Sequence, residues 1–522
     1  MTKQPNFVMI VTDQHCADWL SCAGHPVVKT PHIDRLAARG VRFTQFHTAS
    51  PVCMPNRASM FTGRYPSVHG LKYNGCALPY DARTFVEQLR DNGYQTAAIG
   101  KSHLQPFTGI DMSARWASQG LPAEDAWKTG FEDMDLECPR HYQPGEHFEF
   151  PTPYYGFEHI DMVTGHGDTA GGHYFQWFTQ QTSDWQVLRD PQHQAQHSYT
   201  CPQAKRTLVP EELYTTSYIK QQTVQWLSTQ TSENAPFFLF VSFPDPHHPF
   251  NPPGRYWDLY APEQFRVEHP VSEFEPRVPP LAFAHQRLAA GGQTETPQEA
   301  FAASTRHCQE AMALSAGMLA MIDDAVGTIL DTLTEQGLDD NTVMVFTADH
   351  GDYMGDGQLL LKGPWMRDSI HRVPFIWADC QPAEQRHQGT TDLLGSAVDL
   401  APTILHRAGV TPYFGLQGRN LLEDIQSGDA RSQLLIEFND NVPRLGFKRA
   451  ARSRTLLTAQ WRLTLYAGEG WGELYAHETD PGHQHNLWDD PAYQEIKAVL
   501  IEALATEVTL TMDESPRARM RA

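Results

Sequence analysis

Residues 6–14 read NFVMIVTDQ, a short run of apolar and β-branched side chains that ends in Asp13 and Gln14. Such a run is typical of a strand buried on both faces of a parallel sheet. A second run, TVMVFTADHGD at residues 342–352, has the same form and ends in acidic residues and a histidine. Because ligands of open α/β sheets bind beyond the carboxyl ends of the strands, we expect these polar side chains at one functional edge.

Helical patterns alternate with further short strands along the chain. Thr30 and Pro31 are suited to begin a helix that Gly40 ends. Further helices are predicted at 84–92, 212–230 and 306–336, strands at 94–99 and 237–243, and an extended segment at 41–47. This order predicts an α/β fold, with a large, mostly parallel sheet flanked by helices on both faces.

The pattern changes after about residue 420. Short alternating strands are predicted at 432–438, 454–458, 461–466 and 472–476, followed by a helix at about 491–508. We therefore expect a catalytic α/β domain at residues 1–420 and a small antiparallel α+β subdomain at 421–522.

Residues 105–210 show little periodicity and are rich in aromatic and histidine side chains. We expect long loops over the sheet. Their tryptophans either form a wall of the substrate pocket or a small core beneath the loops, and both interpretations stay open. These tryptophans are Trp116, Trp127, Trp177 and Trp185.

Composition excludes several classes of function. The 522 residues carry a net charge of −22, which argues against binding to nucleic acid or to an anionic membrane. Eight cysteines without a CxxC pair argue against a disulfide scaffold or a zinc ribbon. The N-terminus has no apolar stretch long enough for an export signal, so we expect a cytoplasmic protein with reduced thiols.

Residues 51–64, PVCMPNRASMFTGR, place Cys53 just before a short helix that Pro55 can begin and Gly63 can end. A helix N-terminus favours an anion, and it lowers the pKa of a cysteine. Arg57, one turn on, adds a planar fork that suits a tetrahedral oxyanion.

The pattern C-x-P-x-R-A-S-x-x-T-G-R resembles the signature of the sulfatase family, in the alkaline phosphatase superfamily. Five other segments resemble elements of that family. They are KTPHIDRL at 29–36, GKSH at 100–103, PHHP at 246–249 with LKGP at 361–364, and the stretch from Glu473 to Leu487. The resemblance implies an alkaline phosphatase-like fold.

In that family, a maturation enzyme converts the motif cysteine to formylglycine, so the resemblance implies this change at Cys53. It also implies one divalent metal ion, held by Asp13, Cys53, Asp349 and His350.

Gln14 stands where many sulfatases have a second aspartate, so its role as a ligand is left open. Gln14 and His350 resemble the branch of phosphonate monoester hydrolases and choline sulfatases. Calcium and manganese are both compatible with these donors.

The catalytic residues implied by the resemblance are Cys53, Arg57, Lys101, His103, His247 and Lys362. The hydrated aldehyde at position 53 attacks sulfur, while Arg57, Lys101 and Lys362 offset charge on the oxygens. His247 then serves the leaving group, and His103 accepts the proton whose loss releases sulfate.

Two residues have weaker assignments. By resemblance to the phosphonate branch, Asn74 is expected to contact a substrate oxygen. His248 is a weaker candidate than His247, because neighbouring side chains generally point in different directions.

The sequence is compatible with three functions. The first is hydrolysis of small sulfate monoesters of the arylsulfatase type, and the alternative is hydrolysis of phosphonate monoesters or phosphodiesters at the same site. The third is a catalytically silent binding protein, which predicts unmodified Cys53 and no metal. We expect a homo-oligomer, specifically a dimer.

Overall fold

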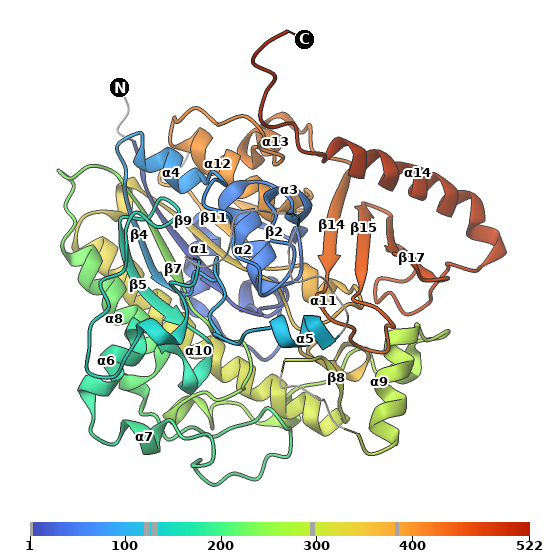
Figure 1. Ribbon diagram of the computed structural model, residues 1–522, viewed down its shortest axis with the longest axis horizontal. Helices are drawn as coiled ribbons and strands as arrows, with labels where there is room; N and C mark the ends of the chain where they lie inside the picture. The colour runs from blue at the N-terminus through green and yellow to red at the C-terminus, as the bar shows by residue number, and fades with distance from the viewer. Residues whose placement is uncertain (1–3, 119–125, 127–133, 293–297, 382–385, 522) are drawn as a thin grey trace.

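The computed structural model describes residues 4–118, 126, 134–292, 298–381 and 386–521. A nine-stranded sheet crosses its centre in the order β12-β2-β11-β9-β1-β7-β4-β5-β6 (Figure 1). In that order, the strands are Gly389–Thr391, Val41–Phe43, Phe375–Ala378, Thr342–Ala348, Asn6–Thr12, Phe237–Ser242, Gln95–Gly100, His159–Thr164 and Gly171–Gly172.

The five central strands, β9, β1, β7, β4 and β5, run parallel. Met9 in β1 lies between Val345 in β9 and Phe240 in β7. Antiparallel strands flank this core, with β11 beside β9 and β6 beside β5. The predicted α/β class with a mostly parallel sheet is therefore confirmed, and the carboxyl ends of the central strands meet at one edge.

Helices cover both faces of the sheet. Val8 and Ile10 of β1 pack on one face with α1 (Pro31–Arg39), α8 (Thr215–Ser228) and α10 (Thr305–Glu335). The intervening β1 residues pack on the other face with α2 (Cys53–Thr62), α4 (Phe85–Arg90) and α12 (Leu400–Arg407). This alternation follows from the two-residue period of a strand.

The 31-residue helix α10 is long and apolar enough to cross a bilayer. However, 89% of its most apolar 18-residue window is buried inside the protein. Burial on this scale is typical of a core helix.

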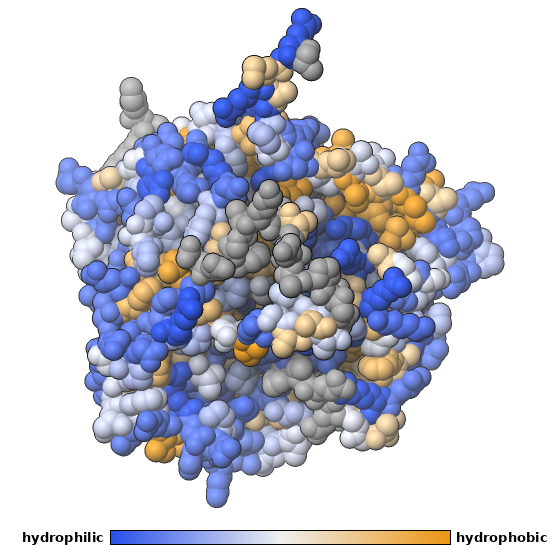
Figure 2. Space-filling view, in the orientation of Figure 1, coloured by the Kyte–Doolittle hydropathy of each residue, from blue (hydrophilic) through white to orange (hydrophobic). Residues whose placement is uncertain are grey.

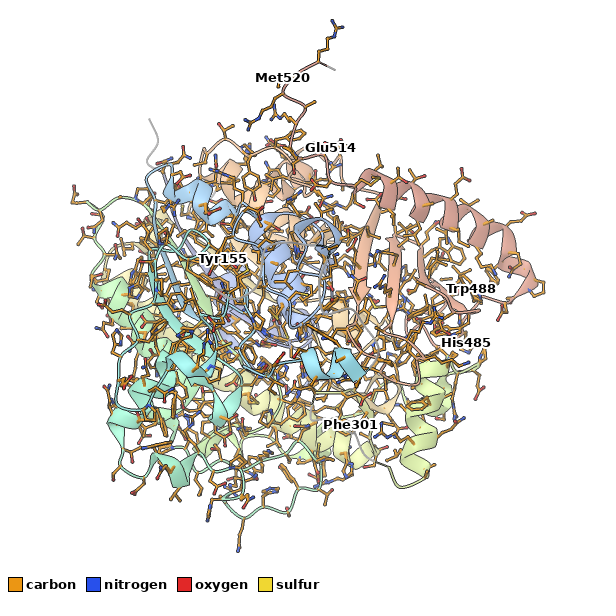
Figure 3. All side chains as sticks on the ribbon, viewed as in Figure 1. Tyr155, Phe301, His485, Trp488, Glu514 and Met520 are labelled. Carbon is orange, nitrogen blue, oxygen red and sulfur yellow. The ribbon has the colours of Figure 1, made fainter. Side chains whose placement is uncertain are left out.

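The C-terminal part contains a four-stranded antiparallel sheet and a long helix, α14 (Gln494–Leu510). Its strands are β14 (Gln433–Asn439), β15 (Arg452–Thr458), β16 (Trp461–Tyr466) and β17 (Gly472–Ala476). Leu500 and Leu504 of α14 pack against the sheet. Trp488 lies beneath α14, where the Lys497 ammonium is 4.5 Å from its ring (Figure 3). Figure 2 shows apolar surface over α14, where Val499 and Leu510 are exposed.

Residues 105–210 contain more regular structure than predicted. The strand β5 belongs to the central sheet, and α6 (His173–Gln181) packs on it. Trp177 and Trp185 pack against the main core. Of the two interpretations, this one agrees with a core beneath the loops. Trp116 is exposed, and Trp127 lies outside the described residues. The mixed burial along β5 explains why periodicity did not predict this strand.

Two local predictions are also corrected. The extended segment at 41–47 is two separate strands, β2 and β3 (Phe46–His47). Gly40 ends α1 with a φ of −138°, so it does not adopt the left-handed cap conformation. A Cβ atom at this position would lie 2.1 Å from the carbonyl oxygen of Trp377 in β11. Close packing of backbone on backbone is therefore what requires glycine here.

Replacing Gly40 by alanine is expected to lower the free energy of unfolding by about 1–3 kcal/mol, because the added methyl group must displace backbone. Urea denaturation followed by tryptophan fluorescence measures this change. The matched control is Gly470→Ala, where a Cβ meets no described atom within 4 Å. This control should stay within about 0.5 kcal/mol of the wild type. Equal stabilities for the two variants would contradict the explanation.

Candidate active site

Polar side chains gather where the central strands end. Asp13 follows β1, and Asp349 and His350 follow β9. Lys101 follows β4, where Gly100 has a φ of 112° and where any Cβ would collide with the Ser242 carbonyl oxygen at 1.9 Å. The sequence therefore needs glycine at position 100 to bring the β4 end against β7.

Asp13, Cys53, Asp349 and His350 form a buried cluster whose donor atoms lie within 4.8 Å of one another. Cys53 is the first residue of α2, so the helix begins earlier than predicted from Pro55. Its Sγ lies 2.9 Å from His350 Nε2 and 3.9 Å from Asp13 Oδ1. Two carboxylates, an imidazole and a sulfur form a donor set that fits one divalent cation.

The orientation of His350 suits a metal ligand. Its Nδ1–H donates to the Gly351 carbonyl oxygen at 2.8 Å, which leaves the Nε2 lone pair facing Cys53 and Asp13. Such a second contact fixes both the tautomer and the ring plane of a ligating histidine. At Gly351, a Cβ would lie 1.9 Å from the Ser369 carbonyl oxygen, so this turn also requires glycine.

Two buried cations neutralise the carboxylates. Arg57 Nε donates to Asp349 Oδ2 at 2.7 Å, and its NH2 group lies 3.4 Å from Asp13 Oδ2. Lys101 Nζ forms a second ion pair with Asp13. Burial by itself raises the pKa of Asp13, but Lys101 and Arg57 hold that pKa well below its usual range. The Asp13 carboxylate is therefore placed to act as an anionic ligand.

Cys53 lies in a positive environment. Burial, and then the Asp13 carboxylate, act to raise the pKa of its thiol. Lys362, His350 and Lys101 outweigh these two effects, so the pKa is lowered. The same charges favour an anionic group at the beginning of α2.

Lys362 contacts two side chains next to the cluster. Its Nζ donates to Gln14 Oε1 at 3.0 Å and contacts His247 Nε2 at 2.9 Å. Gln14 Nε2 donates to Asp352 Oδ2 at 2.6 Å. Asp352 thus orients the Gln14 amide, whose oxygen faces Lys362.

His103 is buried in the turn that follows β4, two residues after Lys101. The Glu137 carboxylate accepts from the backbone nitrogens of His103 and Leu104, both at 3.0 Å. The His103 ring lies 4.1 Å from that of Phe107, centroid to centroid, and its Nδ1 has no hydrogen-bond partner among the described residues. Burial, then Lys101, holds the pKa of His103 well below its ordinary value.

Asn74 reaches the beginning of α2, where its Oδ1 accepts from the Met54 backbone nitrogen at 3.1 Å. Asn56, in the same helix, donates from Nδ2 to the Asp349 backbone carbonyl at 2.6 Å. Asn56 therefore holds α2 against the turn after β9, while Asn74 caps a backbone donor next to Cys53.

Two histidines take part in ways that the motifs did not indicate. His166, just beyond β5, contacts Lys101 Nζ at 2.7 Å and stacks on His247 at a centroid distance of 3.5 Å. His248 was expected to point elsewhere, yet its ring stacks on His247 at 4.0 Å. His166 lies just beyond the end of β5, as the other site residues lie beyond their strands. The sequence analysis did not select it, because β5 itself was not predicted.

A family model described as sulfatase matches residues 5–410 of the chain. A second model, described as the C-terminal part of N-sulphoglucosamine sulphohydrolase, matches residues 360–509. The chain is 27% identical over 504 residues to the uncharacterized sulfatase YidJ of Escherichia coli (strain K12), covering 96% of this chain and 86% of that protein. It is 27% identical over 521 residues to an ulvan-active sulfatase of Formosa agariphila, covering 98% and 82%.

Among solved structures, the phosphonate monoester hydrolase of Agrobacterium radiobacter superposes with a TM-score of 0.75 at 22% identity, covering 98% of this chain and 97% of that one. This likeness shows the alkaline phosphatase-like fold. The sulfatase model extends over far more than half of the chain. By this match, the chain belongs to the sulfatase family, whose members are sulfuric ester hydrolases.

Proposed function

We propose that this protein hydrolyses sulfate monoesters, using formylglycine made from Cys53 and one divalent metal ion. The observation that carries the proposal is the position of Cys53 Sγ, at the N-terminus of α2 and among Asp13, Asp349 and His350. A nucleophile placed there faces both the metal ligands and the cations of the site.

The metal would be held by Asp13, Asp349, His350 and residue 53. All four are buried, and Asp13 and Asp349 are oxygen donors, which suit calcium or manganese. When bound, the ion supplies positive charge that activates an oxygen nucleophile and polarises a sulfate oxygen. Arg57 keeps the two carboxylates in place through its contacts with both.

Formylglycine supplies, as the hydrated aldehyde, one hydroxyl that attacks sulfur and a second whose deprotonation expels sulfate. Lys101 and Lys362 both lower the pKa of Cys53, and we assign them to the charge that develops on the sulfate oxygens. His103 is the group that we assign to the final deprotonation.

His247 is assigned to the leaving group. Its Nδ1–H donates to the His248 carbonyl oxygen at 2.6 Å, so its Nε2 is the acceptor for Lys362. The ammonium of Lys362 is thus the local source of a hydrogen bond or proton for the departing oxygen, directly or through His247.

The alternative is hydrolysis of phosphonate monoesters or phosphodiesters at the same site. It is favoured by the fold shared with a phosphonate monoester hydrolase and by the presence of Gln14 and His350. We place it second, because the named relatives reported above are sulfatases.

Mass spectrometry of the peptide that contains Cys53 tests the nucleophile. Protein co-expressed with a formylglycine-generating enzyme should show the mass of formylglycine, and Cys53→Ala should lose at least about 10³-fold in kcat/KM on an aryl sulfate. Cys201→Ala, at a buried cysteine outside the site, is the matched control and should keep its activity. An unmodified and fully active Cys53 would contradict the proposal.

Metal dependence is tested by chelation and reconstitution. Activity should fall after chelator treatment and return with calcium or manganese, and the preferred ion should raise the melting temperature. At a concentration 100 times its Kd, a ligand stabilises the native state by about 2.7 kcal/mol. Asp349→Asn should reduce both the metal content and this stabilisation, whereas Asp356→Asn, which removes a carboxylate paired with Arg367, should bind metal normally. Full activity of a metal-free sample would overturn this part of the proposal.

Matched substrates separate the two functions. We expect kcat/KM for 4-nitrophenyl sulfate to exceed that for the corresponding phenylphosphonate ester and for bis(4-nitrophenyl) phosphate. Steady-state rates on one matured preparation measure the ratio directly. Faster turnover of both phosphorus esters would make the alternative the main activity.

A further inference from the structure

Three imidazole rings form a stack beside the cluster, which we name the imidazole column (His166, His247 and His248). The rings of His166 and His247 are 3.5 Å apart and inclined by only 8°, and those of His247 and His248 are 4.0 Å apart. His247 and His248 are buried, and the His166 side chain is only 11% exposed. The three rings come from the β5 and β7 ends, so the column links two segments of the sheet edge.

The first ring of the column contacts one lysine of the site. Lys101 Nζ lies 2.7 Å from His166 Nε2 and also pairs with Asp13 Oδ2. An ammonium group has three donors and no acceptor, so the histidine nitrogen must accept. Two of the three N–H donors of Lys101 are therefore used by His166 and Asp13. Among the described contacts, the third N–H is free to bind a substrate oxygen.

The second ring of the column, His247, accepts a hydrogen bond from the other lysine, Lys362. Lys362 Nζ donates to His247 Nε2 and to Gln14 Oε1, which again leaves one donor among the described contacts. Since the His166 and His247 rings are stacked, the two ammonium groups are held by one rigid pair of rings. A shift of the His166 ring would displace Lys101 directly and His247 through the stack.

We propose that His166 is a positioning residue of this site, which orients Lys101 by accepting its hydrogen bond and orients His247 by stacking on its ring. This inference is built on the proposed function, because it assigns Lys101 to the sulfate oxygens and His247 to the leaving group. The inference adds His166 to the site. No sequence motif identified this residue or the segment beyond β5 that contains it.

Two substitutions separate the two contacts. His166→Phe keeps a ring on His247 but removes the acceptor for Lys101. His166→Gln keeps an acceptor near the position of Nε2 but removes the ring. The control is His159→Phe, the same change at the exposed start of β5, where the histidine contacts only Asp161 among the described side chains.

The matured full-length proteins are compared by calorimetric binding of inorganic sulfate and by kcat/KM on 4-nitrophenyl sulfate and on an unactivated alkyl sulfate. His166→Phe should weaken sulfate binding about tenfold and lower kcat/KM on both esters by about 10²-fold, as a small displacement of a catalytic group does. His166→Gln should bind sulfate within about twofold of the wild type. Its loss in kcat/KM should be larger on the alkyl sulfate, whose leaving group needs more help.

Melting temperatures check that each variant is folded. The inference is overturned if His166→Phe binds sulfate and turns over both esters like His159→Phe. It is equally overturned if the Phe and Gln variants lose binding and activity in the same proportions, since that pattern indicates only general damage. A wild type that binds sulfate but hydrolyses no sulfate ester contradicts the proposed function, while the binding comparison still decides the role of His166.

Discussion

The site depends on the buried carboxylate of Asp13. An ionised carboxylate that leaves water without partners costs several kcal/mol, so its burial requires compensation nearby. Arg57 from α2 and Lys101 from the β4 end supply it, and His350 from the β9 turn lies 3.4 Å from its Oδ1. One carboxylate thus ties four segments of the chain together at the edge of the sheet where the candidate site lies.

The distribution of charge explains how a strongly acidic protein can accept an anionic ester. The net charge is −22, yet Arg57, Lys101 and Lys362 converge on one buried position. The carboxylates of Asp349 and Asp13 neutralise the positive charges of Arg57 and Lys101. Lys362, by contrast, contacts the neutral groups of Gln14 and His247 and forms no ion pair among the described residues. Its charge remains available for the substrate, in a site where the surrounding protein screens less than water does.

The sequence predicted the parts of this arrangement that local spacing controls. Asp13 and Asp349 could be placed because each directly follows an apolar run, and Cys53 because its helix motif is contiguous. His166 could not, because its place depends on β5, whose mixed burial blurs the two-residue period. The positions of His248 and Gln14 depend on turns beyond the strands, where alternation no longer fixes the direction of a side chain. The requirement for glycine at position 40 comes from contact with β11, more than 300 residues away, which no local pattern reports.

The geometry also indicates where a choice between sulfate and phosphonate esters would be made. Both kinds of ester present a tetrahedral group with one negative charge, so Lys101 and Lys362 have little basis on which to separate them. Discrimination at the transition state must then come from the leaving group and from the bonds that change most during reaction. His247 contacts Lys362 and stacks on His166 at that part of the site, and both histidines also lie close to Asp13. The segments beyond β5 and β7, which supply the imidazole column, are therefore where we expect substitutions to change the preference between the two kinds of ester.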